Sequence, residues 1–216
     1  MGPENAAHPE RTSGALSVRA VVFDIGNVLY GWDIRALYAK LIDNPARLDW
    51  FCSHVVTPEW HFQHDAGRPH AETVAELIAE FPDEAELISH YVPRWLETIT
   101  GPVPGMHDIV RELGQRGVPL YAITNFSAEF WDMFRPHEPI FDLFRDIVVS
   151  GAEKLIKPDP AIYRLALRRF GLQPGEGLFV DDRLDNIEAG EAEGFPGHHF
   201  TGAQGFRARL VAEGLL

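Results

Sequence analysis

Residues that could act together in group transfer are spread over four short segments of the chain. Asp24, the pair Asp181-Asp182 and Thr124 each follow a run of apolar residues, and Lys157 stands before the segment Pro-Asp-Pro. A carboxylate can attack phosphorus or carbon and form a covalent intermediate. A lysine can neutralise the negative charge that develops on the transferred group. Alone, each residue is typical of a strand end or a solvated loop, so it is their combination that indicates chemistry.

The acids also indicate a metal site. A buried strand that ends in a carboxylate places that charge at the carboxyl edge of a parallel sheet, where open α/β folds bind ligands. Asp24, Asp181 and Asp182 would repel one another at this edge unless a cation lay among them. Hard oxygen ligands suit Mg²⁺. We therefore expect Mg²⁺ as the cofactor.

The hydrophobic patterns predict an α/β fold with a doubly wound parallel sheet, because strand and helix patterns alternate after residue 100. No strand signal appears between residues 31 and 100, where caps at Asp33 and Asn44 and helical stripes over 71–81 and from Asp83 to Leu96 predict an all-helical insertion. The expected domains are a flexible leader over 1–17, a core over 18–30 and 101–216, and a helical cap over 31–100. The expected strands are 18–23, 118–123, 146–149, 177–180 and 197–200.

Composition excludes some partners. The 216 residues carry a formal net charge of −13, which argues against nucleic acid because phosphate backbones require clustered Lys and Arg. A small phosphorylated metabolite remains compatible with this charge, because a local lysine and a metal can override the global field. No apolar stretch approaches the length of a membrane span. Cys52 is the only cysteine, and the leader lacks a signal-peptide pattern, so we expect a cytoplasmic protein. The sequence does not specify an oligomeric state.

The order nucleophile, hydroxyl, lysine and acid pair resembles the four motifs of the haloacid dehalogenase (HAD) superfamily. The resemblance covers nearly the whole chain after residue 17 and implies a Rossmann-like core with an inserted cap. It implies that Asp24 is the nucleophile and that Thr124 holds a phosphoryl oxygen, with the Asn125 amide beside it. It also implies that Lys157 neutralises the nucleophile and the transferring group.

The acid pair distinguishes two branches of this superfamily. Phosphatases carry acids at this position and bind Mg²⁺, whereas the similar dehalogenases carry Ser and Asn and use no metal. The resemblance implies that Asp24, Asp182 and the backbone carbonyl of Gly26 ligate the metal, with Asp181 bound directly or through water. Asn186 matches a position that supports the acid loop. Asp185 is expected only to cap the following helix.

Gly26 departs from the usual phosphatase motif, which has a second aspartate two residues after the nucleophile. That aspartate protonates the leaving group and later activates water, a role typically worth about 10²–10⁴-fold. Its absence is compatible with a slow phosphatase, with a cap residue acting in its place, or with a non-hydrolytic protein. Without any donor, acidic leaving groups such as the anomeric oxygen of a sugar 1-phosphate should depart fastest.

The segment from His61 to Arg68, together with the Asp-x-Gly-Asn-Val motif, resembles a subgroup that contains an α-D-glucose-1-phosphate phosphatase. His61, His64, Asp65 and Arg68 are therefore candidates for substrate contact or proton transfer. The expected function is a Mg²⁺-dependent phosphomonoesterase that forms an aspartyl-phosphate on a small phosphorylated metabolite. The alternatives are a 2-haloacid dehalogenase and a non-catalytic HAD-fold binding protein.

Overall fold

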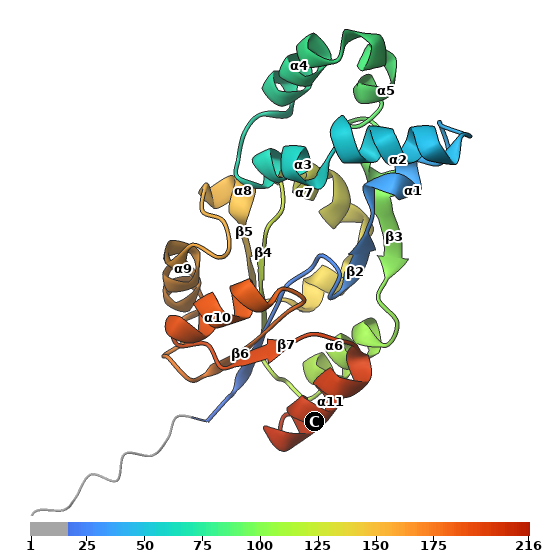
Figure 1. The fold of residues 1–216 in the computed structure, drawn as a ribbon. Helices are drawn as coiled ribbons and strands as arrows, with labels where there is room; N and C mark the ends of the chain where they lie inside the picture. Colours follow the sequence, from blue (N-terminus) through green and yellow to red (C-terminus); the bar gives the residue numbers. More distant parts are fainter. Residues whose placement is uncertain (1–16) are drawn as a thin grey trace, which may run out of the picture.

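A five-stranded parallel sheet forms the centre of the core in the computed structural model, which describes residues 17–216. The strand order is β5-β4-β1-β6-β7, so the first strand of the chain lies in the middle (Figure 1). All four neighbouring pairs are parallel, with register partners such as Phe23 and Ala122. The strands are β1 Ala20–Phe23, β4 Leu120–Thr124, β5 Asp146–Val149, β6 Gly177–Asp181 and β7 Gly197–His199.

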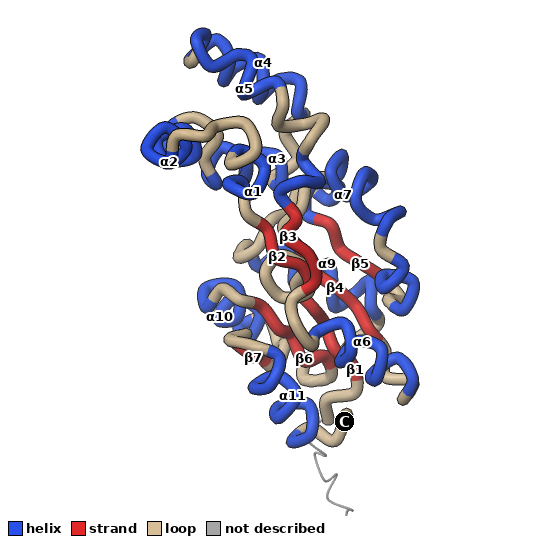
Figure 2. The backbone as a smooth tube through the Cα atoms, turned by 90° about the vertical axis from the view of Figure 1, so that its right-hand side faces the viewer, coloured by secondary structure: helices blue, strands red, loops and turns tan. Residues whose placement is uncertain are grey.

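Helices cover both faces of this sheet, which explains why β1 is completely buried. Val21 and Phe23 belong to a hydrophobic cluster shared with α6 Met106–Gln115 and α11 Ala203–Ala212. Ala20 and Val22 point into a second cluster, shared with α9 Pro160–Phe170 and α10 Leu184–Ala192. The predicted doubly wound sheet is thus confirmed (Figure 2). Four shorter segments follow β4 or β5: α7 Ala128–Phe134, α8 Ser150–Glu153 and the 3₁₀ turns Arg135–His137 and Pro139–Leu143.

A helical insertion lies over the carboxyl edge of the sheet (Figure 1). Along the chain it follows β1 and precedes the other strands of the sheet. Its elements are α1 Ile34–Tyr38, α2 Pro45–His54, α3 Pro58–Asp65, α4 His70–Glu80, α5 Ala85–Ser89 and the 3₁₀ turns Pro82–Glu84 and Trp95–Thr98. The predicted caps are confirmed at Asp33 and Asn44, whose side chains accept backbone N–H groups of α1 and α2.

Two features of the insertion differ from the sequence-based prediction. Strand β2 Tyr30–Trp32 pairs antiparallel with β3 Ile99–Pro102, although no strand was expected between residues 31 and 100. The helix expected to run from Asp83 to Leu96 is broken, since α5 ends at Ser89. The predicted leader lies outside the described residues except for its last position. No helix within residues 17–216 combines the length and apolarity needed to cross a bilayer.

Candidate active site

Asp24 lies directly after β1, at the carboxyl edge of the sheet. Its backbone N–H donates to the Val180 carbonyl (2.8 Å), so the neighbouring strand fixes its position. Its carboxylate is buried, with Oδ1 at 2.9 Å from Nζ of Lys157 and 2.7 Å from the Ile25 amide. Burial raises the pKa of Asp24 to about 7, although Lys157 opposes this shift. The predicted nucleophile is therefore a buried carboxylate beside a cation.

The acid pair follows β6, and its two members have different environments. Asp181 is fully buried; Oδ2 accepts from Nζ of Lys157 (2.6 Å), and Oδ1 accepts from the Asn186 amide (3.0 Å) and the Arg183 backbone (2.8 Å). Asp182 is half-buried and faces the cavity beside Asp24. Asp181 therefore anchors the lysine, and Asn186 contacts the acid loop, as the resemblance implied.

The three acids fit a divalent cation. Each of Asp24, Asp181 and Asp182 offers a carboxylate oxygen within 4.8 Å of the other two. Lys157 compensates for one of the three negative charges, and the nearby Arg183 is paired with Asp185 at 2.6 Å. The remaining charge and the hard oxygen donors suit Mg²⁺. Asp182 and Asp24 are the more open candidate ligands, because Asp181 is completely buried and both of its carboxylate oxygens are hydrogen-bonded.

Asn125 holds the lysine loop against the end of β4. Its side-chain Nδ2 donates to the Lys157 carbonyl (3.0 Å), and the Lys157 backbone N–H donates to its Oδ1 (2.8 Å). Asn125 also lines the cavity, whereas Thr124 is completely buried and absent from the lining. The Thr124 hydroxyl has no partner within residues 17–216. Contact of either residue with a phosphoryl group stays a prediction, but Asn125 has a positioning role that the sequence did not reveal.

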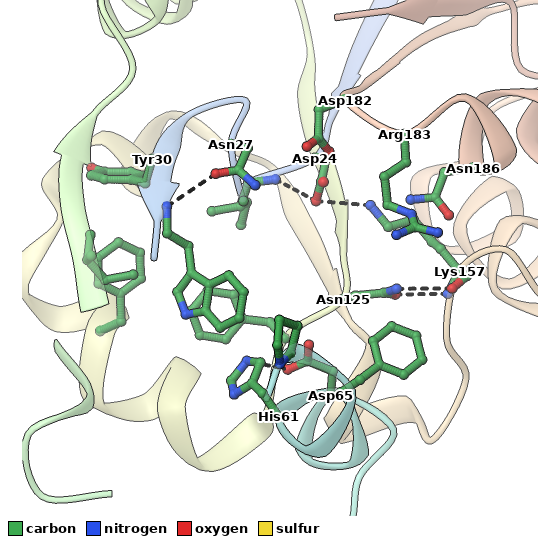
Figure 3. Close-up of a pocket in the computed structure, with 18 of the residues that line it drawn as sticks. Asp24, Asn27, Tyr30, His61, Asp65, Asn125, Lys157, Asp182, Arg183 and Asn186 are labelled. Atoms are coloured by element: carbon green, nitrogen blue, oxygen red, sulfur yellow. Dashed lines mark hydrogen bonds and ion pairs between the residues drawn. The ribbon is translucent and has the colours of Figure 1, made fainter. Parts of the chain in front are cut away.

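A cavity of about 280 Å³ separates these core residues from the cap. Figure 3 shows Asp24 and Asp182 on one side of it and His61 and Asp65, from helix α3, on the other. Its walls are largely apolar and aromatic, a feature that no local sequence pattern indicated. The apolar lining residues are Ile25, Tyr30, Trp32, Pro58, Phe62, Trp95, Ile99, Phe126 and Phe134.

The four polar cap candidates separate into two pairs. His61 and Asp65 line the cavity, and Nδ1 of His61 is 2.6 Å from the Tyr91 hydroxyl. His64 and Arg68 do not line it. His64 is buried, with Nε2 at 2.6 Å from the Thr73 hydroxyl, and Arg68 pairs with Glu76 at 2.7 Å near the surface. Burial lowers the pKa of His61 and of His64, which makes both rings neutral near pH 7.

We therefore expect the two pairs to respond differently to substitution. His61→Asn should change KM across a panel of phosphate esters by more than tenfold for some members, because it reshapes the cavity wall. Arg68→Ala should leave the KM of each ester within about twofold of the parent value, because Arg68 belongs to an exposed ion pair. Steady-state kinetics on both variants check this. A larger change in specificity for Arg68→Ala than for His61→Asn would contradict the observed arrangement.

A family model described as haloacid dehalogenase-like hydrolase matches residues 18–194. The chain belongs to this family. Among its relatives, the sesquiterpene phosphatase astK of Aspergillus oryzae is 27% identical, over 85% of this chain and 90% of the relative. The glyceraldehyde 3-phosphate phosphatase of Methanopyrus kandleri is 32% identical, over 78% of this chain and 77% of the relative. The chain is therefore a HAD-like hydrolase with phosphatases among its relatives.

Solved HAD structures share the fold. A HAD family enzyme of Bacteroides thetaiotaomicron, in complex with magnesium and inorganic phosphate, has a TM-score of 0.63 at 17% identity and covers 86% of this chain and 95% of its own. An L-2-haloacid dehalogenase has a TM-score of 0.60 at 24% identity, with 84% and 85% covered. At these identities the similarity shows the HAD fold alone, so it does not separate phosphatase from dehalogenase.

Proposed function

We propose that this HAD-like hydrolase is a Mg²⁺-dependent phosphomonoesterase that acts through an aspartyl-phosphate on a small phosphorylated metabolite. The observation that carries the proposal is the cluster of Asp24, Asp181 and Asp182 around Lys157. A dehalogenase would have no need for three acids at one site. The cavity of about 280 Å³ accommodates a small organic group, near the lower end of common ligand pockets, which begin at roughly 300 Å³.

Each residue of the cluster has a separate role in the proposed reaction. Asp24 attacks phosphorus, the bond from phosphorus to the ester oxygen breaks, and water then hydrolyses the aspartyl-phosphate. Lys157 offsets negative charge on the nucleophile and on the phosphoryl oxygens, and it is held in place by Asp181 and Asn125. Mg²⁺ held by Asp24, Asp182 and the Gly26 carbonyl would supply further positive charge at the phosphoryl group.

Two substrate classes follow from different observations. The sequence resemblance favours a sugar 1-phosphate, whose pyranose ring has an apolar face. The aromatic lining favours the phosphate ester of an apolar alcohol, and the sesquiterpene phosphatase among the relatives supports this second class. The cap brings few polar groups to the lining for recognition of several sugar hydroxyls. They are the side chains of His61 and Asp65 and the indole N–H groups of Trp32 and Trp95. We therefore expect the apolar ester to be the better substrate.

A panel of phosphate monoesters tests both the function and the class. It contains glucose 1-phosphate, glucose 6-phosphate, glyceraldehyde 3-phosphate, geranyl phosphate and farnesyl phosphate, with release of inorganic phosphate as the measurement. We expect the highest kcat/KM for an isoprenoid ester. A higher value for glucose 1-phosphate would favour the sugar class. Halide release from 2-chloropropionate, without phosphate release from any ester, would overturn the phosphatase proposal in favour of a dehalogenase.

Metal binding provides a readout that does not depend on turnover. Mg²⁺ should raise the Tm of the parent protein, because a ligand that binds only the folded state stabilises it. Asp182→Ala should remove most of this rise. Asp185→Ala is the matched control, since its carboxylate pairs with Arg183 outside the acid cluster, and it should retain the rise. An equal loss in both variants, or none in either, would contradict the proposed ligand set.

A further inference from the structure

The active site lacks a proton donor on the side where the family motif would place one. Gly26 has no side chain, and a Cβ built there would have no atom within 4 Å, so no neighbouring side chain fills the space. The leaving alcohol must nevertheless take up a proton, because an alkoxide is a poor leaving group near neutral pH. In the part of the chain that the structure describes, the cap carboxylate that lines the cavity is Asp65.

Asp65 is hydrogen-bonded to the core through its backbone and lies in the cavity wall. It ends helix α3, and its backbone carbonyl accepts from the Ser150 hydroxyl of the core (2.6 Å). Its side chain is 9% exposed, and Oδ1 has no hydrogen-bond partner within residues 17–216; the nearest cation candidate, Nε2 of His61, is 3.5 Å away. A buried carboxyl group without a full set of partners is unusual, because burial of an unpaired polar group is destabilising.

We propose that Asp65, carried by the cap, is the proton donor that Gly26 cannot be. This rests on the proposed phosphatase function. In the first step Asp24 bonds to phosphorus, the phosphorus–oxygen bond of the ester breaks, and the ester oxygen takes the proton of Asp65 and leaves as an alcohol. In the second step the Asp65 carboxylate takes a proton from the water that attacks the aspartyl-phosphate, which releases phosphate and restores both carboxyl groups.

The surroundings of Asp65 keep its carboxyl protonated. Burial raises the pKa of Asp65 to about 8, and the negative charge of Asp24 adds to this, while the Ser127 amide and Lys157 oppose it. The other titratable groups that face it contribute no positive charge. Burial lowers the pKa of His61 and raises the pKa of Tyr91, so both are neutral near pH 7. An acid with a pKa near the working pH is suited to proton transfer.

This role reverses one expectation from the sequence. Without a donor, the rate should depend steeply on the acidity of the leaving alcohol. With Asp65 as donor, the parent enzyme should show a shallow dependence, and the dependence should become steep only when the carboxyl is removed. The anomeric oxygen of a sugar 1-phosphate then has no special advantage.

Asp65→Asn provides the central test, measured with Mg²⁺ on aryl and alkyl phosphates of graded leaving-group pKa. We expect kcat/KM for alkyl esters to fall by about 10²–10³-fold and for 4-nitrophenyl phosphate by only a few-fold. In the parent, hydrolysis of alkyl esters should become slower above about pH 8, because the Asp65 carboxyl loses its proton there. This decrease should be absent in Asp65→Asn. Glu59 is an exposed acid on the same helix, so Glu59→Gln is the matched control. It should leave unchanged the slope of log kcat/KM against the pKa of the leaving group.

A second variant separates chemistry from folding. Gly26→Asp in the Asp65→Asn background places a carboxyl in the open space of the family position, and it should restore a shallow slope. An equal loss for all esters in Asp65→Asn, or a slope as steep in the parent as in Asp65→Asn, would overturn the proposal. Such a result would leave the phosphatase function intact, since that function depends on turnover by the parent and its loss in Asp24→Asn.

Discussion

Replacement of Asp24 by Asn should abolish turnover of every phosphate ester. The amide keeps the shape of the carboxylate but cannot attack phosphorus, so we expect kcat to fall by a factor on the order of 10⁴ or more, as is typical when a covalent nucleophile is removed. Inorganic phosphate release measures the loss. Rapid quenching of the parent during turnover, followed by peptide mass spectrometry, should show a phosphoryl group on the peptide that contains Asp24.

The same variant should remain folded. Removal of the Asp24 charge leaves Lys157 paired with Asp181 at 2.6 Å, so the buried lysine is still compensated. Circular dichroism and the Tm should therefore stay close to those of the parent. Residual phosphatase activity well above background in a folded Asp24→Asn protein would exclude the covalent mechanism, and so would a phosphoryl group trapped on another residue.

Lys157→Met should lower both stability and activity. Lys157 is 1% exposed and pairs with Asp24 (2.9 Å) and Asp181 (2.6 Å). Its loss leaves two buried carboxylates without a cation, and breaking a buried pair in this way typically lowers the free energy of unfolding by about 3–5 kcal/mol. Loss of a charge aimed at the transferred group should also lower kcat by roughly 10²–10³-fold.

Urea denaturation in EDTA measures the stability change without interference from metal. Lys154→Met is the matched control, because Lys154 is exposed in the same loop region and should change the free energy of unfolding by less than about 0.5 kcal/mol. A change below about 1 kcal/mol for Lys157→Met would mean that the protein already neutralises the acid cluster by another route. The ion pairs seen here would then contribute little.

The core of the site was predictable because it depends on local patterns and one rule of sheet geometry. The apolar runs before Asp24, Thr124 and Asp181 identified parallel strands, and parallel strands place their carboxyl ends on one edge. The positions of Lys157 and Asn186 around the acids agree with the resemblance, since both contact Asp181.

The parts that were missed depend on distant contacts. Strands β2 and β3 are short and contain Gly31, Gly101 and Pro102, which are poor strand formers, and only their mutual pairing makes them strands. The stripe after Asp83 has helical spacing, but Pro93 prevents a continuous helix through Trp95.

Helix α11 was not predicted, although Phe206 and Leu210 are buried four residues apart on it. These two are the only buried residues of the helix, and Gly205 beside Phe206 lowers the helix propensity of the segment. The burial of Asp65 had no local signal either. The segment that contains it reads as a polar surface helix, and only the approach of the cap to the core removes it from water.

The pairing of β2 with β3 places the two ends of the insertion side by side. Tyr30 is opposite Pro102, and Trp32 is opposite Ile99. The insertion is therefore a loop that leaves the core and returns to it at neighbouring positions. The entropic cost of bringing the two ends of such a loop together depends only weakly on the number of residues in it. Lineages could exchange or lengthen the segment between Asp33 and Thr98 without displacing a strand of the sheet. A different cap joined to the core at the β2–β3 pair would then give a different substrate range, while the acid cluster of the core stays unchanged.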